Sequence, residues 1–198
     1  MTIPTSNTLM LTEKAMEQDE LLVRRLKNGD HEAFESLVEA YRPRIYATLY
    51  NLLGRYQEAE EAIWDVFSEI WKSIGRFKGE SKLSTWIYSL TTHVAYHRRR
   101  KRGATAIPFE EIEPNVAAPS NLETDVLRHE ESRLVEKGIS ALPESLRVPL
   151  VLHSIAGLDY EEISKVLKLP VGALKTRVWR AKLELKKVLE PWMNQPST

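Results

Sequence analysis

The sequence predicts an all-α fold with two helical domains, and three observations support this prediction. Apolar residues recur at three- and four-residue spacing through most of the chain, and no stretch alternates as a half-buried strand would. Residues 104–121 (ATAIPFEEIEPNVAAPSN) contain three prolines and no periodicity, which is typical of a flexible linker. The 198 residues are enough for two small domains. We therefore expect an N-terminal extension, a first domain, the linker, a second domain and a tail, at residues 1–16, 17–103, 104–121, 122–190 and 191–198.

The composition excludes several classes of protein. The chain has no cysteine, so it lacks disulfides, thiolate metal sites and thiol redox centres. It has no apolar run near the roughly 18 to 20 residues of a membrane span, and its N-terminus lacks the basic-then-apolar order of a signal peptide. These features predict a cytoplasmic protein without direct membrane insertion.

Charge is unevenly distributed along the chain although its formal total is zero, with 28 Lys and Arg residues against 28 Asp and Glu residues. The run HRRRKRG at residues 97–103 contains five consecutive cations, and residues 165–187 are mostly basic. Acidic residues gather between positions 110 and 136. Because the electrostatic footprint of nucleic-acid binding is local, two basic surfaces are compatible with that function despite the neutral total.

The first domain is predicted to contain four helices. The first helix ends shortly before Asp30, which is a suitable N-cap for the second. Pro43 is expected to bend or break this second helix. A third apolar stripe covers residues 59–74, the turn RFKGES follows, and a fourth helix runs from Leu83 into the run of cations.

The second domain contains the strongest local signal, GLDYEEISKVLKLPVGALKTRVWRAKLEL at residues 157–185. Asp159 and Glu162 have the spacing of a capping box at the start of a short helix, and Pro170 lies just after its end. A longer basic helix begins near Val171. This layout is that of a helix-turn-helix, whose second helix enters the major groove of DNA. The stripe expected to face inward from the second helix is Leu174, Val178, Ala181, Leu185 and Val188.

The outward face of this second helix predicts the residues that read DNA. With the apolar stripe turned inward, Thr176 and Arg180 point outward at about 100° per residue. Arginine binds guanine through two hydrogen bonds, and Ala or Thr methyl groups contact thymine. Trp179 lies on a flank, where it either meets DNA or packs on the preceding helix. The expected base-proximal residues are Ala173, Thr176, Arg177, Trp179 and Arg180, and Lys175 is placed to reach phosphates.

Sequence blocks in both domains resemble a known family. EAEEAIWDVFSEIWKSI and FKGESKLSTWIYSLTTHVAYHRRRKR lie in the first domain, and LPESLRVPLVLHSIAGLDYEEISKVL and VGALKTRVWRAKLEL lie in the second. Over nearly the whole chain, they resemble bacterial sigma factors of the extracytoplasmic-function group of the sigma-70 family. The resemblance implies binding to core RNA polymerase and to promoter DNA, with the minus-10 element recognised by the first domain and the minus-35 element by the second. It also implies control by an anti-sigma factor, which is often membrane-bound.

The resemblance assigns the contact with core polymerase to the third helix. Trp64 stands where the family usually has glutamine, and Trp71 lies beside the same apolar stripe. Two large aromatic residues beside a core stripe either widen the core or form a protein-binding edge, where tryptophan is enriched. Both possibilities stay open at this point. The candidates for polymerase binding are Glu58, Glu61, Trp64, Asp65, Phe67 and Trp71.

The turn at residues 77–82 resembles the loop with which the family holds a flipped-out minus-10 base; taken alone, it also fits a plain turn between helices. Glycine allows close backbone approach, and a serine hydroxyl can read a base edge. In the following helix, the wheel places Trp86 in the core and Tyr88 outward, where a tyrosine beside cations suits stacking on unpaired bases. Arg99 is the cation expected to meet promoter phosphate. The predicted minus-10 residues are Lys78, Gly79, Ser81, Lys82, Thr85, Tyr88, Thr92, Tyr96 and Arg99.

An enzyme has little support in the sequence, because no catalytic set or phosphate-binding glycine loop is evident. His93 and His97 have metal-ligand spacing but no third ligand, so we expect no metal, no cofactor and no small-molecule substrate. The rival interpretations are a stand-alone helix-turn-helix regulator and, more weakly, a nucleic-acid-modifying enzyme. The basic fourth helix with its outward Tyr and Thr favours a sigma factor over both.

Overall fold

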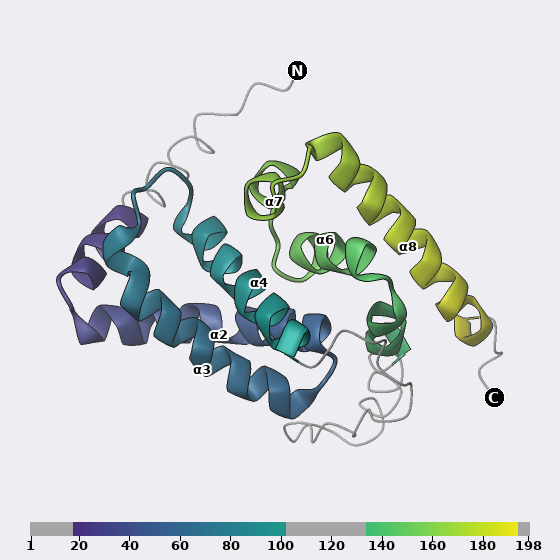
Figure 1. Cartoon of the computed structure of the whole chain (residues 1–198), viewed down its shortest axis with the longest axis horizontal. Helices are drawn as coiled ribbons and strands as arrows, with labels where there is room; N and C mark the ends of the chain where they lie inside the picture. The colour runs from purple at the N-terminus through teal and green to yellow at the C-terminus, as the bar shows by residue number, and fades with distance from the viewer. Residues whose placement is uncertain (1–17, 102–133, 194–198) are drawn as a thin grey trace.

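The computed structural model describes residues 18–101, called here the N-terminal half, and residues 134–193, the C-terminal half (Figure 1). Within these ranges every regular element is a helix, which confirms the predicted all-α class. None of these helices is long and apolar enough to cross a lipid bilayer. The predicted N-terminal extension, the linker, the first part of the second domain (residues 122–133) and most of the tail lie outside the described residues. The N-terminal half contains a helix at residues 18–27, α2 (His31–Leu53), α3 (Tyr56–Ser73), a 3-10 turn (Ile74–Arg76) and α4 (Leu83–Lys101); the C-terminal half contains a helix at residues 134–141, α6 (Glu144–Ser154), α7 (Tyr160–Leu167) and α8 (Val171–Met193).

Helix α2 begins where its predicted cap lies. Gly29 adopts a left-handed φ of 76°, which ends the preceding helix. The Asp30 carboxylate then accepts a hydrogen bond from the backbone N–H of Ala33 at 3.1 Å. Arg25 donates to the other carboxylate oxygen at 2.6 Å, and this contact holds the pKa of Asp30 below its ordinary value. The predicted N-cap is therefore confirmed, with an ion pair that the cap pattern does not contain.

The core of the N-terminal half lies where α2, α3 and α4 pack together. Helix α2 continues through Pro43 from His31 to Leu53, so the expected break is absent. Each fully buried Leu, Ile or Val side chain contributes about 1.5–3 kcal/mol relative to an exposed one. The buried aliphatic residues of this core include Leu26, Leu37, Ile45, Leu49, Leu53, Ile63, Val66, Ile70, Leu83 and Ile87.

The C-terminal half forms the predicted helix-turn-helix from α7 and α8. The N–H of Glu162 donates to the Asp159 carboxylate at 2.8 Å, and the N–H of Asp159 donates to the Glu162 carboxylate at 2.9 Å, which completes the capping box. Lys168 ends α7 in the left-handed region, with φ of 54°. The inward stripe of α8 is buried at Leu174, Val178 and Ala181, whereas Leu185 is half-buried and Val188 is exposed, so it ends earlier than predicted.

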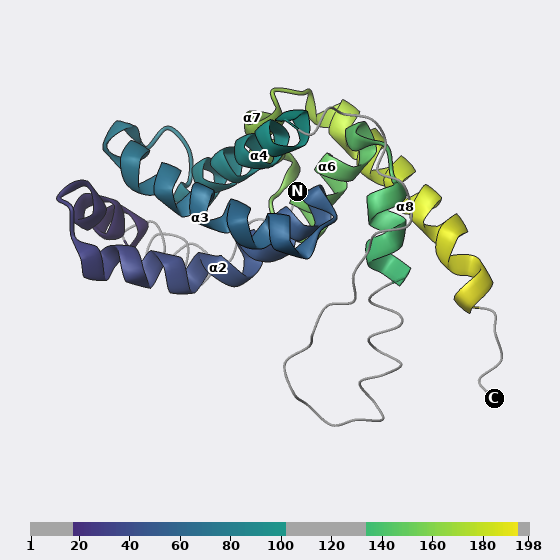
Figure 2. The same ribbon diagram turned by 60° about the horizontal axis from the view of Figure 1, so that its bottom comes forward.

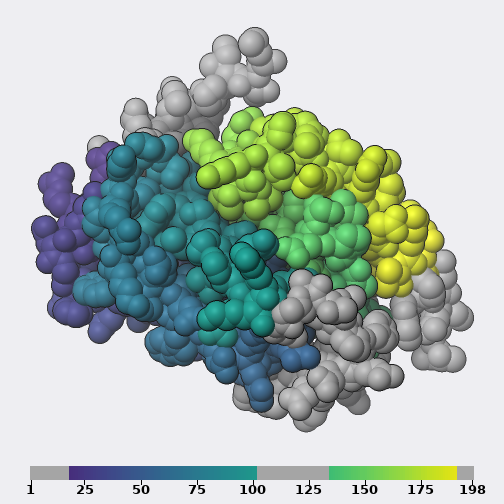
Figure 3. Space-filling view, viewed as in Figure 1, coloured from purple at the N-terminus to yellow at the C-terminus, as the bar shows by residue number. Residues whose placement is uncertain are grey.

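The two halves pack against each other. Helix α2 contacts α6, and α4 contacts α7. Both ribbon views place α4 between the rest of the N-terminal half and the C-terminal half (Figures 1 and 2). The space-filling view shows the teal surface of α4 meeting the green surface of the C-terminal half (Figure 3). The burial of residues on α4 therefore depends on both halves of the chain.

Candidate nucleic-acid interface

The exposed face of α8 carries four of the six residues predicted to read duplex DNA. Lys175, Thr176, Trp179 and Arg180 are exposed. The Trp179 side chain is 60% exposed, so packing on the preceding helix, the alternative interpretation, is wrong. The Lys175 ammonium lies 5.8 Å from the centre of the Tyr160 ring on α7, and this contact orients its aliphatic stem along the motif.

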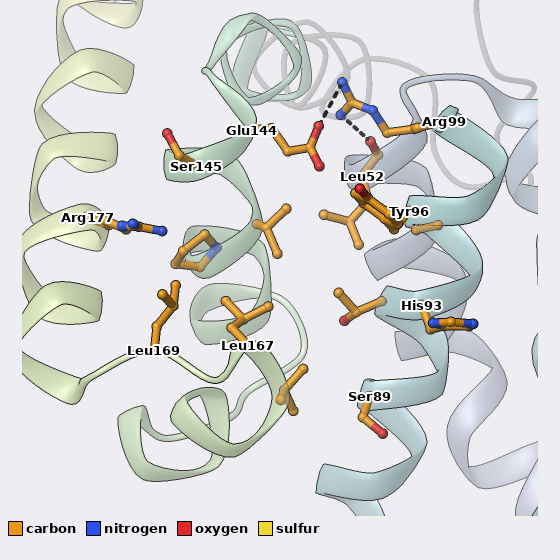
Figure 4. Close-up of a pocket in the computed structure, with 15 residues that line it drawn as sticks. Leu52, Ser89, His93, Tyr96, Arg99, Glu144, Ser145, Leu167, Leu169 and Arg177 are labelled. Atoms are coloured by element: carbon orange, nitrogen blue, oxygen red, sulfur yellow. Dashed lines mark hydrogen bonds and ion pairs between the residues drawn. The ribbon is translucent and has the colours of Figure 1, made fainter. Parts of the chain in front are cut away.

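The other two residues of α8 that were predicted to read DNA are less accessible to it. Ala173 is half-buried, and Arg177 is half-buried with its side chain in a cavity that faces the N-terminal half. The helical wheel placed Arg177 on a flank of the DNA-reading face because it treated that flank as solvent. In the structure, Arg177 points toward α6 of its own half (Figure 4), and it contributes to the cavity that α4 and α6 also line.

The loop at residues 77–82 is held by two contacts at its first residue, Phe77. Lys27 from the first helix donates to the backbone carbonyl of Phe77 at 2.6 Å. The Phe77 ring is buried, and its centre lies 5.2 Å from that of Trp86. Lys78 and Gly79 remain exposed, and Gly79 has a φ of 75°, which favours glycine. The loop therefore presents its tip to solvent from a fixed base, while Ser81 is half-buried.

The burial of Tyr88 shows that the predicted orientation of α4 is wrong. Its side chain is 1% exposed, so it belongs to the core rather than to an outward face. Burial raises the pKa of the phenol to about 12, and its hydroxyl has no hydrogen-bond partner. Trp86, which the wheel placed in the core, is half-buried. The wheel aligned the core with Leu90 and Val94, whereas the buried face is rotated toward Tyr88 and Ala95.

Thr85 and Arg99 also differ from their predicted exposure. Thr85 is 3% exposed, and its hydroxyl donates to Glu162 of α7 at 3.2 Å. Arg99 donates to the backbone carbonyl of Leu52 at 3.3 Å and lies 3.6 Å from the Glu144 carboxylate (Figure 4). The C-terminal half covers this side of α4, which no pattern within the helix reveals. The remaining two residues follow the prediction more closely, since Tyr96 is exposed and Thr92 is half-buried.

A cavity of about 590 Å³ lies where the two halves meet. Figure 4 shows His93, Tyr96 and Arg99 projecting from α4 on one side, and Glu144, Leu167 and Arg177 on the other. Aliphatic and polar side chains both line its walls. The cavity therefore combines surfaces from both halves, and it exists only while they stay together.

The predicted polymerase-binding residues of α3 divide into two groups. Trp64 is 66% exposed, which favours the interface over the core for this residue. Phe67 is buried, so its direct contact with polymerase is corrected to a role in the core. Trp71 packs against Phe34 at a ring-centre distance of 4.8 Å and is half-buried. Of the three acidic candidates, Glu61 and Asp65 are exposed and Glu58 is half-buried.

The histidine pair on α4 shows no metal-site geometry. The His93 and His97 rings lie 4.3 Å apart, edge to face, and both are exposed. Among the residues that the structure describes, no group of three or more His, Cys, Asp or Glu side chains is arranged to hold a metal ion.

Comparisons with known proteins agree with this geometry. Residues 37–105 match the family model Sigma-70 region 2, and residues 132–185 match Sigma-70, region 4. The chain is 33% identical to the RNA polymerase sigma-H factor of Pseudomonas aeruginosa over 94% of its own length and all of the relative's. It is 31% identical to the extracytoplasmic-function (ECF) sigma factor SigW of Bacillus subtilis, over 84% of this chain and 94% of that one. The chain therefore belongs to the sigma-70 family of RNA polymerase sigma factors. Its similarity to named ECF factors confirms the predicted group.

Two solved structures share the fold. One is CnrH in complex with the cytosolic domain of CnrY, with a TM-score of 0.67 and 19% identity over 87% of this chain and 97% of that one. The other is the sigma factor RpoE of Bartonella quintana in complex with the anti-sigma factor NepR, with a TM-score of 0.65 and 22% identity over 79% and 96%. These similarities establish the architecture of both domains.

Three residues with site contacts escaped sequence reasoning. Lys27 anchors the loop at residues 77–82, and Glu144 and Glu162 contact predicted promoter-facing residues. Glu162 had a local signal, but only for its capping role. Its second role depends on how α7 meets α4, which local sequence does not encode.

Proposed function

We propose that this sigma factor binds core RNA polymerase and directs it to promoters with distinct minus-10 and minus-35 elements. The observation that carries the duplex-reading part is the exposed face of α8, formed by Lys175, Thr176, Trp179 and Arg180. In this proposal, Arg180 forms two hydrogen bonds to guanine, and the Thr176 methyl group contacts thymine. In this proposal, the predicted second domain (residues 122–190) acts on the minus-35 element, and the predicted first domain (residues 17–103) acts on the minus-10 element and core polymerase.

The minus-10 surface in this proposal is the loop at residues 77–82 with the adjoining part of α4. Lys78, Gly79, Ser81 and Lys82 lie in the loop, and the anchored base of the loop limits the entropy lost on binding. Thr85, Thr92, Tyr96 and Arg99 adjoin it along α4. Extruding a base costs a few kcal/mol, which a preformed loop offsets. Tyr88 acts here through packing, because its side chain is buried.

The polymerase-facing surface in this proposal is the exposed side of α3. Trp64 is a large apolar side chain at the surface, next to the carboxylates of Glu61 and Asp65. An exposed tryptophan surrounded by charge is typical of a binding hot spot. Glu58 and Trp71 lie at its margins, where they support the surface from half-buried positions.

The remaining parts of the proposal concern chemistry and control. The chain acts in the cytoplasm as a specificity factor and performs no covalent chemistry of its own. An anti-sigma factor controls it, in line with one structural neighbour, a sigma factor that was solved in complex with an anti-sigma factor.

One experiment tests this function. Purified protein is mixed with sigma-free core polymerase and a library of genomic promoters, and run-off transcripts are sequenced. We expect transcripts that start downstream of a shared pair of elements. No transcripts, together with a footprint by the protein alone on a palindromic duplex, would instead identify a stand-alone helix-turn-helix regulator.

A further inference from the structure

The two halves of the chain meet at a surface that is called here the seam. Among residues 18–101 and 134–193, at least four polar contacts cross it, and these four share one arrangement, in which the C-terminal half supplies a glutamate carboxylate while the N-terminal half supplies a donor. Tyr50 donates to Glu136 at 3.0 Å. The other three contacts join Lys82 to Glu162 at 3.0 Å, Thr85 to Glu162 at 3.2 Å, and Arg99 to Glu144 at 3.6 Å.

Three of these four donors belong to the proposed minus-10 surface. Lys82, Thr85 and Arg99 are the type of residue that contacts DNA phosphates, since each offers an N–H or O–H donor. A glutamate carboxylate and a phosphate are both anionic acceptors, so they compete for the same donors. The C-terminal half therefore occupies, with its own carboxylates, positions that a nucleic-acid backbone would take.

The carboxylate of Glu162 is held in place by the fold. One oxygen accepts the N–H of Asp159 within the capping box, and the other faces Lys82 and Thr85. Its contact raises the pKa of Lys82. Because the capping box fixes the side chain, Glu162 loses little conformational entropy when it engages α4.

The seam is suited to open as well as to close. The side chain of Lys82 is mostly exposed and that of Glu144 is partly exposed, so salt screens both ion pairs and each contributes little. Helix packing adds to these contacts, because α4 packs against α7 and α2 against α6. Several weak contacts together hold the halves closed, and a competing polyanion can replace the ionic ones.

We propose that the free protein rests in this closed arrangement, in which Glu144 and Glu162 act as internal phosphate substitutes that suppress binding to single-stranded minus-10 DNA. Binding to DNA releases both carboxylates and separates the halves. This inference rests on the proposed promoter-binding function, but the spacing of the halves tests it without DNA.

The first experiment measures that spacing in the full chain. Because the sequence has no cysteine, Glu35→Cys on α2 and Lys186→Cys on α8 place two spin labels specifically. We expect a narrow distance distribution in the free protein. The double variant E144Q/E162Q should broaden it, while glutamine at 162 still accepts the Asp159 N–H and preserves the cap. The matched control E39Q/E161Q removes the same charge from exposed positions outside the seam and should keep the narrow distribution.

The second experiment measures binding of the same proteins to a single-stranded oligonucleotide that carries the minus-10 element. We expect E144Q/E162Q to bind about two- to tenfold more tightly than E39Q/E161Q at low salt, the gain from removing weak ionic contacts. A broad distribution in the free wild type, or equal distributions and affinities for both double variants, would overturn the proposal. If E144Q/E162Q broadens the distribution but the run-off assay yields no transcripts, the closed seam stands and the promoter function fails.

Discussion

Arg98 on α4 is bound to Asp65 on α3, with its Nε donating to the carboxylate at 2.8 Å, and a second nitrogen lies 3.0 Å from the Glu61 carboxylate. One cation of the basic run therefore joins two helices of the N-terminal half. It also pairs with two acids of the proposed polymerase-facing surface, Glu61 and Asp65. A run of like charge thus contains residues with different partners and different tasks.

Because Arg98 has these partners, we expect its replacement to reduce folding stability more than replacement of a neighbouring cation. Arg98→Ala removes a two-pronged ion pair and should lower the free energy of unfolding by about 0.5–1 kcal/mol. Arg100→Ala removes the same charge from an exposed position of the same helix and should leave it unchanged. Urea denaturation of both variants measures the difference. Equal stabilities would show that the contact between α3 and α4 is not maintained in solution.

The two tryptophans of α3 predict opposite phenotypes. Trp64→Ala should preserve stability and weaken binding to core polymerase on the order of tenfold, because Trp64 is exposed. Trp71→Ala removes a ring packed on Phe34 and should cost about 2 kcal/mol of stability. Thermal unfolding and titration of labelled polymerase separate the two effects. Loss of stability in Trp64→Ala would place that ring in the core.

Tyr88 predicts an unusual tolerance to the loss of a polar group. Tyr88→Phe removes a buried hydroxyl that has no partner, so stability should stay equal or rise by about 1 kcal/mol. Tyr88→Ala should cost about 3–5 kcal/mol. Chemical denaturation measures both. If the hydroxyl instead faced DNA, Tyr88→Phe would weaken binding to the minus-10 oligonucleotide without any change in stability.

The buried Tyr88 phenol also predicts that folding stability depends on pH in the alkaline range. Burial raises its folded-state pKa to about 12, above the unfolded value of about 10. The neutral phenol's contribution to stability is therefore complete below pH 10 and is lost as pH rises from about 10 through 12. Denaturation midpoints across this range should fall less steeply in Tyr88→Phe than in the wild type, and parallel curves would contradict the assignment.

The ion-paired Asp30 predicts that folding stability also depends on pH in the acidic range. The hydrogen bond from Arg25 lowers the folded-state pKa of Asp30 below the unfolded value of about 3.9. Its contribution is thus present above that value and lost as pH falls through the folded pKa. Asp30→Asn retains an oxygen for the Ala33 N–H but not the ion pair, so its stability should depend less on pH below about 4. Urea midpoints at several pH values test this expectation.

Arg180 and Lys175 should affect promoter choice differently. Arg180→Ala should change the preferred base at one minus-35 position, with a loss of roughly 5- to 100-fold on the best sequence. Lys175→Ala should weaken binding to all sequences alike and reduce its salt dependence. Selection from a randomised minus-35 library at two salt concentrations distinguishes them. A uniform loss for Arg180→Ala would remove it from the base-reading set.

The features that sequence predicted best are encoded within a few neighbouring residues. The Asp30 cap, the Asp159–Glu162 capping box and the turn before Val171 each depend on contacts inside one helical turn, so pattern reading recovers them. The exposed face of α8 followed from the predicted five-residue apolar stripe, of which Leu174, Val178 and Ala181 are buried. Such signals also sufficed for the all-α class, because they set where each helix begins and ends.

The predictions of burial that were wrong concern α4, which packs against helices from both halves. A helical wheel divides a helix into core and solvent sides, but α4 packs on α2, α3 and α7 at once. Thr85 is therefore buried by a helix that lies far along the chain, and Tyr88 fills the core rather than facing solvent. The partner of Arg99 was unpredictable for the same reason, since Glu144 is remote in sequence. Burial that arises between domains leaves no periodic trace in either.

Glu162 has two structural roles, and together they limit which residues can replace it. The same carboxylate starts the first helix of the DNA-reading motif and contacts the loop and helix that adjoin the other promoter element. A substitution that removes its acceptor oxygens would shorten α7 and loosen the seam in one step. Only side chains of similar length with an acceptor at the end satisfy both requirements. Mutational drift that adjusted minus-35 recognition through α7 would therefore alter the resting state of the whole molecule.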